Sequence, residues 1–189
     1  MKAARMVAMA VFLAGCAVVS PYDEVIDKGI VEFAEQFNTF VKNMADAGGK
    51  QEGTYEANTR TYNTLESKLD VLIARASAAS DGKACKVEKK IYERLGRILQ
   101  DSIPPELKSE STDPSGNADG CNARLLVLVK KQLETVREIH KTSDKCPSPT
   151  GQISCLRRAT TATALKIANQ SINAVSVVES AKKNLTREN

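Results

Sequence analysis

Apolar residues recur at helical spacing along most of the chain, and this pattern predicts an all-α fold. In the first such segment the apolar residues follow one another every three or four positions: Ile26, Ile30, Phe33, Phe37, Phe40 and Met44. Such a stripe is the buried face of an amphipathic helix. Ser20 and Pro21 suit its start, and Gly48–Gly49 suits its end.

The same criterion predicts helices over about 54–80, 85–102, 121–142 and 152–185, with a long loop at 103–120 and a turn at 146–151. The most apolar stripe belongs to 121–142: Leu125, Leu126, Leu128, Val129, Leu133, Val136 and Ile139. The thinnest belongs to 152–185: Leu156, Thr160, Thr163, Ile167, Ala174, Val178, Ala181 and Leu185. No segment alternates as a strand does. We therefore expect one domain over 21–189, a bundle of four to five helices with near-heptad packing.

The first residues predict export. Lys2 and Arg5 precede an eight-residue apolar run, Met6 to Leu13, which is far shorter than the roughly 20 residues that cross a bilayer. Residues 1–15 are therefore expected to be a signal peptide.

The tetrad Leu13-Ala14-Gly15-Cys16 resembles the lipobox of bacterial lipoproteins. The resemblance implies that Cys16 carries a diacylglyceryl group through a thioether, that cleavage occurs before it, and that its new amine is acylated. Residues 16–20 would then be a short lipidated tether, and no cofactor beyond these acyl chains is expected. Because Ala17 and not Asp follows Cys16, proteobacterial sorting rules imply the outer membrane, with the bundle facing the periplasm.

A second resemblance begins just after the lipobox. The segment from Tyr22 to Ile30, followed by Tyr62 and the pattern Leu65, Leu69, Leu72 and Arg75-Ala76, is similar to small uncharacterised helical lipoproteins of proteobacteria. The likeness covers about 60 residues. It implies a class of protein and no activity.

Four cysteines remain in the exported chain, and an even set in an oxidising compartment predicts two disulfides. Cys121 and Cys146 cannot pair, because the helix between them separates them by about 33 Å, whereas bridged Cα atoms lie roughly 6 Å apart. Pairing Cys121 with Cys155 would require the chain after Cys146 to run back along that helix, although 152 onwards is predicted to be helical. The expected pairs are Cys85–Cys121 and Cys146–Cys155. The cysteine spacings match no zinc module, so no metal site is expected.

Composition narrows the function classes. The 189 residues are 42% apolar and 26% charged, with a mean hydropathy of −0.30, as in one soluble globular domain. Cleavage before Cys16 removes Lys2 and Arg5 and so lowers the net charge of +4 by two. No basic stripe interleaved with aromatic residues is present, which argues against nucleic acid as a partner.

Candidate catalytic chemistry is sparse. His140, the single histidine, has no Asp, Ser or Cys at helical spacing, so we expect it to stabilise the end of its helix. Its neighbours Glu134, Arg137, Glu138 and Lys141 are expected to form a solvated, ion-paired face. The short basic pairs Arg157-Arg158 and Lys182-Lys183 could meet anionic lipid or glycan, although such pairs are commonly just surface. No P-loop, nucleophile elbow or paired carboxylates occur, and an enzyme is not expected.

These patterns favour a non-enzymatic, lipid-anchored periplasmic bundle that binds a protein partner as an interaction or envelope-scaffold module. The alternative is a pilotin-like escort lipoprotein, which would bind a helix of a secretion-system subunit in an apolar groove. The small residues of the last helix allow either close packing or a groove beside it. Because its apolar stripe is thin, this helix is expected to contribute least to the core and to offer a docking surface. Ala168 and Ala174 are the candidate binding residues on it.

Overall fold

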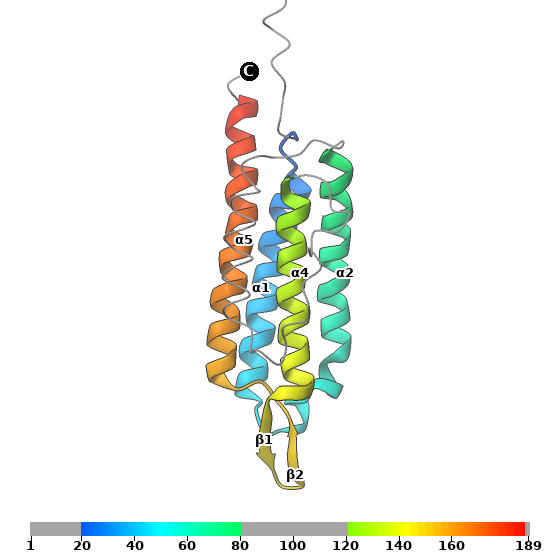
Figure 1. The fold of residues 1–189 in the computed structure, drawn as a ribbon, viewed down its shortest axis with the longest axis vertical. Coiled ribbons are helices and arrows are strands. Elements are labelled where there is room, and N and C mark those ends of the chain that lie inside the picture. Colours follow the sequence, from blue (N-terminus) through cyan, green and yellow to red (C-terminus); the bar gives the residue numbers. More distant parts are fainter. Residues whose placement is uncertain (1–19, 81–120, 188–189) are drawn as a thin grey trace, which may run out of the picture.

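The computed structural model describes residues 20–80 and 121–187, which form a helical bundle. Four long helices run alternately up and down: α1 (Glu24–Asp46), α2 (Tyr55–Ser80), α4 (Cys121–Glu138) and α5 (Arg158–Arg187). Helix α1 packs against α2 and α5, and α4 packs against the same two helices from the opposite corner (Figure 1). The coarse prediction of an all-α bundle is thereby confirmed. The predicted helix 85–102, the loop 103–120 and the lipobox lie outside the described residues.

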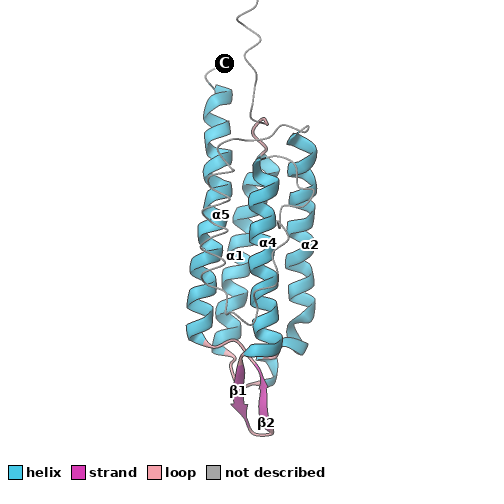
Figure 2. Cartoon of the chain, in the orientation of Figure 1, coloured by secondary structure: helices cyan, strands magenta, loops and turns pink. Residues whose placement is uncertain are grey.

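Short elements complete the bundle at one end. The 3₁₀ turn η1 (Gln51–Gly53) joins α1 to α2, and the π-helical turn η3 (Ile139–Ser143) extends α4. A hairpin of β1 (Lys145–Ser148) and β2 (Gly151–Ser154) then leads into α5, as Figure 2 shows. We call this the hairpin end, and the opposite end, where α1 begins and α5 finishes, the N-terminal end.

The apolar stripes of α1 and α4 form the core as predicted. All six stripe residues of α1 and all seven of 121–142 are buried. Phe33 and Phe37 stack with ring centroids 5.6 Å apart. Gly29 faces α2, where a Cβ atom would lie 2.7 Å from Leu72 Cδ2, so this glycine allows α1 and α2 to approach closely.

The boundaries of the first helix differ from the prediction. Asp23, not Ser20, is the N-cap residue: its carboxylate accepts hydrogen bonds from the N–H groups of Val25 and Ile26. After α1 ends, Gly49 adopts a φ of 85°, and a Cβ there would lie 2.7 Å from the carbonyl oxygen of Pro147. Only glycine meets both conditions, because other residues are strained at positive φ.

The predicted helical start at residue 152 is wrong. Residues 151–154 form strand β2, which pairs antiparallel with β1 in the register Cys146↔Ile153 and Ser148↔Gly151. Gly151 has a φ of 127°, which suits a tight turn rather than a helix. The disulfide Cys146–Cys155 is present as predicted, with Cα atoms 5.8 Å apart. It closes the base of the hairpin, so that α5 begins only at Arg158. The predicted partner bridge Cys85–Cys121 falls outside the described part of the chain.

The predicted stripe of the last helix is wrong in phase. Thr163 and Ala181, both predicted to be inward, are exposed. The buried positions of α5 are Thr161, Ala168, Ser171, Ile172, Val175, Glu179 and Lys182. Four of these are polar or charged, so hydropathy alone does not identify the inward face of α5.

Candidate functional site: two buried polar clusters and a lateral groove

A buried ion pair lies at the N-terminal end of the bundle. Glu179 is fully buried and Lys182 is 4% exposed, and Lys182 Nζ lies 2.9 Å from Glu179 Oε1. The same ammonium group donates a hydrogen bond of 3.0 Å to the hydroxyl of Ser20. Ser20 is therefore held against α5, and the expectation that Lys182 lies on the surface is wrong.

The carboxylate of Glu179 also reaches two other helices. Its Oε2 accepts a 2.9 Å hydrogen bond from the backbone N–H of Asp23, and its Oε1 accepts one from the side-chain amide of Asn122 on α4. Asp23 in turn forms an ion pair with Arg75 on α2, with 2.7 Å between Oδ2 and Nε. We call Ser20, Asp23, Asn122, Glu179 and Lys182 the N-terminal cluster. It links α5 directly to α1 and α4, and through Asp23 to α2.

Hydrogen bonds decide the charge state of Asp23. Partial burial works to raise the pKa of this carboxyl group, but the hydrogen bonds from Arg75 and from the N–H groups of Val25 and Ile26 outweigh it. The pKa of Asp23 is therefore held below its ordinary value. The N-cap is ionised at neutral pH, which suits its place at the positive end of the α1 dipole.

Polar contacts continue along α5. The Gln132 amide on α4 donates to the hydroxyl of Ser171, and the Asn38 amide on α1 donates to Asn169 Oδ1. Together with Asn122, these side chains hydrogen-bond to α5 through their N–H groups. Their buried amide oxygens have no hydrogen-bond partner among the described residues. The contacts of α5 with α1 and α4 are thus partly polar, unlike the apolar core between the other helices.

A buried histidine occupies the hairpin end. His140 is fully buried, with Nε2 2.9 Å from the carbonyl oxygen of Gly53 and Nδ1 2.9 Å from the hydroxyl of Tyr62. A carbonyl oxygen can only accept, so Nε2 carries the hydrogen, and Nδ1 accepts from Tyr62 in the neutral ring. Burial lowers the pKa of His140. The expected role as a cation at the helix end is therefore wrong, because this imidazole is neutral and joins α2, η1 and η3.

Arg137 supports the same region from α4. Its guanidinium group donates to Glu66 and Asn63 at 3.0 Å each and to the hydroxyl of Tyr55 at 3.2 Å. Arg137 is only partly exposed, so it bridges α4 to α2 instead of belonging to the solvated face that the sequence suggested. We call Gly53, Tyr55, Tyr62, Arg137 and His140 the histidine cluster.

The hairpin is tied to the start of α2. The hydroxyl of Ser154 accepts from the N–H of Tyr55 and donates to Glu56 Oε2, both at 2.9 Å. Arg157 donates through its side chain to the carbonyl oxygen of Lys145 and covers the outer edge of β1. These bonds and the disulfide fix the hairpin relative to the histidine cluster.

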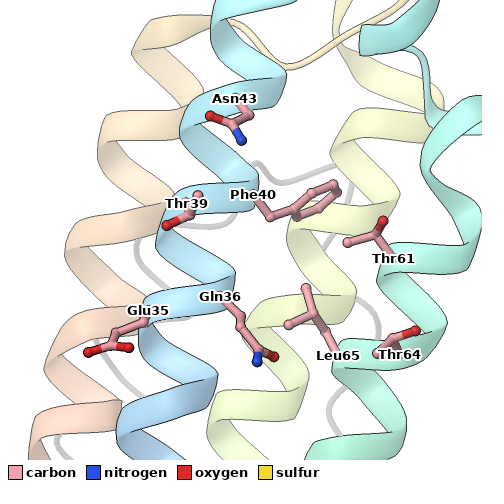
Figure 3. A pocket seen from close by; sticks show the side chains of 8 residues that line it. All are labelled: Glu35, Gln36, Thr39, Phe40, Asn43, Thr61, Thr64 and Leu65. Atoms are coloured by element: carbon pink, nitrogen blue, oxygen red, sulfur yellow. The ribbon is translucent and has the colours of Figure 1, made fainter.

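A shallow groove of about 510 Å³ lies between α1 and α2, as Figure 3 shows. Its lining residues are Glu35, Gln36, Thr39, Phe40, Asn43, Thr61, Thr64 and Leu65. Six of the eight are polar, and the two apolar ones, Phe40 and Leu65, are buried members of the core. The groove therefore offers hydroxyl and amide groups at its rim, while most of the surface exposed inside it is apolar. It also lies away from α5, where the sequence placed a possible groove.

The other predicted site residues separate into three groups. Ala168 is 1% exposed and belongs to the core, so its predicted role in docking is wrong. Ala174 is partly buried against the same core. Cys16 and Cys85 lie outside the described residues. Within 20–80 and 121–187, no three His, Cys, Asp or Glu side chains are grouped to hold a metal ion, and no helix has the length and apolarity to span a membrane.

Comparisons with protein-family models, curated proteins and solved structures give no match to this chain. Sequence reasoning missed the N-terminal cluster, although a signal for it exists. Thr161, Ala168, Val175 and Lys182 recur every seven residues, and Ile172 and Glu179 share that interval. This heptad identifies the inward face of α5 once charged residues are allowed within it.

Breaking the buried ion pair should destabilise the bundle strongly. In Lys182→Met, the carboxylate of Glu179 stays buried without its counter-ion, and we expect a loss of about 3–5 kcal/mol in the free energy of unfolding. The double variant Glu179→Gln with Lys182→Met should recover part of that loss. Lys28→Met is the matched control, because the Glu24–Lys28 pair is exposed and should contribute little. Urea denaturation followed by circular dichroism measures all three; equal losses in Lys182→Met and Lys28→Met would contradict the assignment.

The histidine cluster should make stability depend on pH. The pKa of His140 is lowered in the folded state from its ordinary value of 6.5, so the unfolded chain binds the proton more readily. Stability should therefore fall as the pH drops below about 6.5 and level off once folded His140 is protonated. The sequence contains one histidine. In His140→Gln, the free energy of unfolding should therefore no longer change with pH between 7.5 and 5.5, the range around the ordinary histidine pKa of about 6.5. Urea midpoints that still shift with pH in this variant would assign the effect to another group.

Proposed function

We propose that this protein is a lipid-anchored, non-enzymatic helical bundle of the bacterial envelope that acts as an interaction or scaffold module. Cys16 carries the lipid, the outer membrane is its location, and the bundle faces the periplasm. A second disulfide, Cys85–Cys121, belongs to the same proposal. The lipobox Leu13-Ala14-Gly15-Cys16 is its starting point.

The observation that carries the proposal is the placement of Ser20. This residue follows Cys16 by four positions, and Lys182 holds it against the N-terminal end of the bundle. A lipid on Cys16 would therefore fasten the domain by one end. The sides of the helices and the hairpin end would then extend away from the membrane, over a length of about 35 Å for the 23 residues of α1.

The use of the polar side chains supports a binding rather than a catalytic role. Both ring nitrogens of His140 are hydrogen-bonded, to Tyr62 and to Gly53, and the charge of Glu179 is neutralised by Lys182. Both clusters connect helices, and His140, Glu179 and Lys182 at their centres are buried. The surface that remains for a partner consists of the helix sides, including the groove between α1 and α2.

The groove bears on the alternative of a pilotin-like escort. Such a protein binds an amphipathic helix through a continuous apolar surface. Among the described residues the groove between α1 and α2 is hollowed, but its rim is polar. Its exposed lining is mainly apolar, so the groove fits a helix as well as a folded partner and keeps the escort as a second candidate.

Replacing Cys16 tests the anchor. In Cys16→Ser, labelling with a palmitate analogue should disappear and the protein should keep its precursor length, because the thiol that accepts the lipid is gone. Ala17→Asp is the matched control. It keeps the thiol, so it should label normally, but an Asp after the lipidated Cys should shift the protein from the outer to the inner membrane fraction. Labelling that persists in Cys16→Ser would refute the anchor, and an unchanged fraction for Ala17→Asp would refute the sorting.

Site-specific crosslinking tests the interaction role. A photoreactive amino acid would be placed at Thr61 on the groove rim, at Val71 on the outer face of α2 and at Val177 on α5, all of them exposed. A module with one binding face should give a discrete adduct from one of these positions and not from all. Cys16→Ser should weaken that adduct if the partner is met at the membrane. The absence of an adduct at every position, with the protein correctly located, would count against the role.

A further inference from the structure

We propose that the N-terminal end of the bundle is a lipid-contacting surface, in which Tyr22 and Lys183 lie in the headgroup region of a bilayer with anionic phosphates. This inference rests on the proposed lipid anchor at Cys16 and deepens it, because it assigns the membrane contact to residues of the folded domain. The argument follows from chain length, from the direction of α5 and from the chemistry of the exposed side chains.

Chain length sets how far this end can lie from the membrane. Only residues 17–19 separate Cys16 from Ser20, which the ammonium group of Lys182 holds at 3.0 Å. Four Cα–Cα steps span about 14 Å at full extension. Ser20, at the outer edge of the N-terminal cluster, therefore cannot lie farther than this from the acylated residue.

Helix α5 fills much of that distance. It continues past Lys182 to Arg187, five residues or about 8 Å, at the end of the bundle where α1 begins (Figure 1). When the bundle stands upright on its anchor, the end of α5 comes within about 6 Å of the level of Cys16. The polar headgroup layer is itself about 5–8 Å thick on each side of a bilayer. The last turn of α5 thus reaches the headgroups even when the tether is fully extended. Lys183, four residues or about 6 Å before Arg187, reaches them when the tether is shorter than its full extension.

The side chains at this end suit that environment. The exposed Lys183 has its Nζ 5.2 Å from the centroid of the partly exposed Tyr22 ring, so a cation and an amphipathic aromatic residue lie together there. Tyrosine and lysine are typical of membrane interfaces, where the ring lies at headgroup level and the ammonium group meets phosphate. Val25, in the first turn of α1, adds an apolar side chain that is 49% exposed.

Most acidic groups of this end are neutralised by cations. Asp23, Glu24 and Glu179 form ion pairs with Arg75, Lys28 and Lys182, whereas Asp27 accepts a hydrogen bond from the neutral hydroxyl of Tyr22 and keeps its charge. Lys183 lies over the Tyr22 ring and also acts on Glu24, whose pKa is lowered chiefly by the hydrogen bond from Lys28 and to a smaller extent by the charge of Lys183. Lys183 is exposed, so its ammonium group is accessible to a phosphate.

The chain contains no tryptophan, which makes a single introduced tryptophan a clean probe of depth. Tyr22→Trp would be purified with its lipid and reconstituted into vesicles of phosphatidylethanolamine and phosphatidylglycerol, part of them with brominated acyl chains. Thr150→Trp, in the exposed turn of the hairpin, is the matched control. We expect blue-shifted emission and bromine quenching at position 22, and unchanged emission at position 150. Val25→Trp is a second probe should Tyr22→Trp alter the melting temperature.

Charge reversal tests the phosphate contact. Lys183→Glu should reduce the quenching of the probe at position 22 while leaving flotation with vesicles intact, whereas Lys42→Glu, near the hairpin end, should change neither. Protein that floats but shows equal quenching at positions 22 and 150 overturns the lipid-contacting surface and leaves the anchor standing. Protein that neither carries lipid nor floats overturns the proposed function and this surface with it. Unchanged quenching in Lys183→Glu limits the contact to Tyr22 and refutes the phosphate contact.

Discussion

The buried carboxylate of Glu179 is the constraint on which the arrangement of the bundle depends. Removing an ionised group from water costs several kcal/mol, and only a counter-ion with additional hydrogen bonds offsets that cost. Lys182 supplies the charge from one turn away, but the other donors belong to Asp23 and Asn122, at the starts of α1 and α4. They meet Glu179 only when α5 adopts one position along the bundle. The N-terminal cluster thus fixes the position of α5 relative to α1 and α4.

The apolar core provides stability but leaves α5 weakly specified. Helices α1, α2 and α4 present Phe, Tyr and Leu to one another, whereas the buried face of α5 offers mainly small residues such as Ala168 and Ser171. A face of small residues could slide by one turn with little change in apolar burial. The hydrogen bonds of Ser171 and Asn169 to Gln132 and Asn38 remove that freedom. The disulfide-closed hairpin fixes the start of α5, and the N-terminal cluster fixes its last turns.

Sequence reasoning succeeded where large apolar residues determine the face of a helix. Phe33 and Phe37 on α1 and Leu125 on α4 can only be inward, and their stripes identify both helices. It failed on α5 and on His140, because a buried polar side chain is stable only through partners far away in sequence. Ser20 illustrates the same limit: its type suggests a helix cap, but its hydroxyl accepts from Lys182, 162 residues later. The hairpin was missed because its strands of four residues are too short to show alternation.

An anchored bundle of this kind would differ from a domain on a flexible linker. A long linker lets a domain rotate freely, whereas a tether of three residues that ends in a buried ion pair restricts both distance and tilt. The groove between α1 and α2 would then lie at a defined distance from the membrane surface. Glu35 and Asn43 follow Asp23 by 12 and 20 residues on α1, or about 18 and 30 Å along the helix axis. On the proposed anchor, an occupant of this groove would therefore approach from the periplasmic side, because the headgroup layer would end well below Glu35.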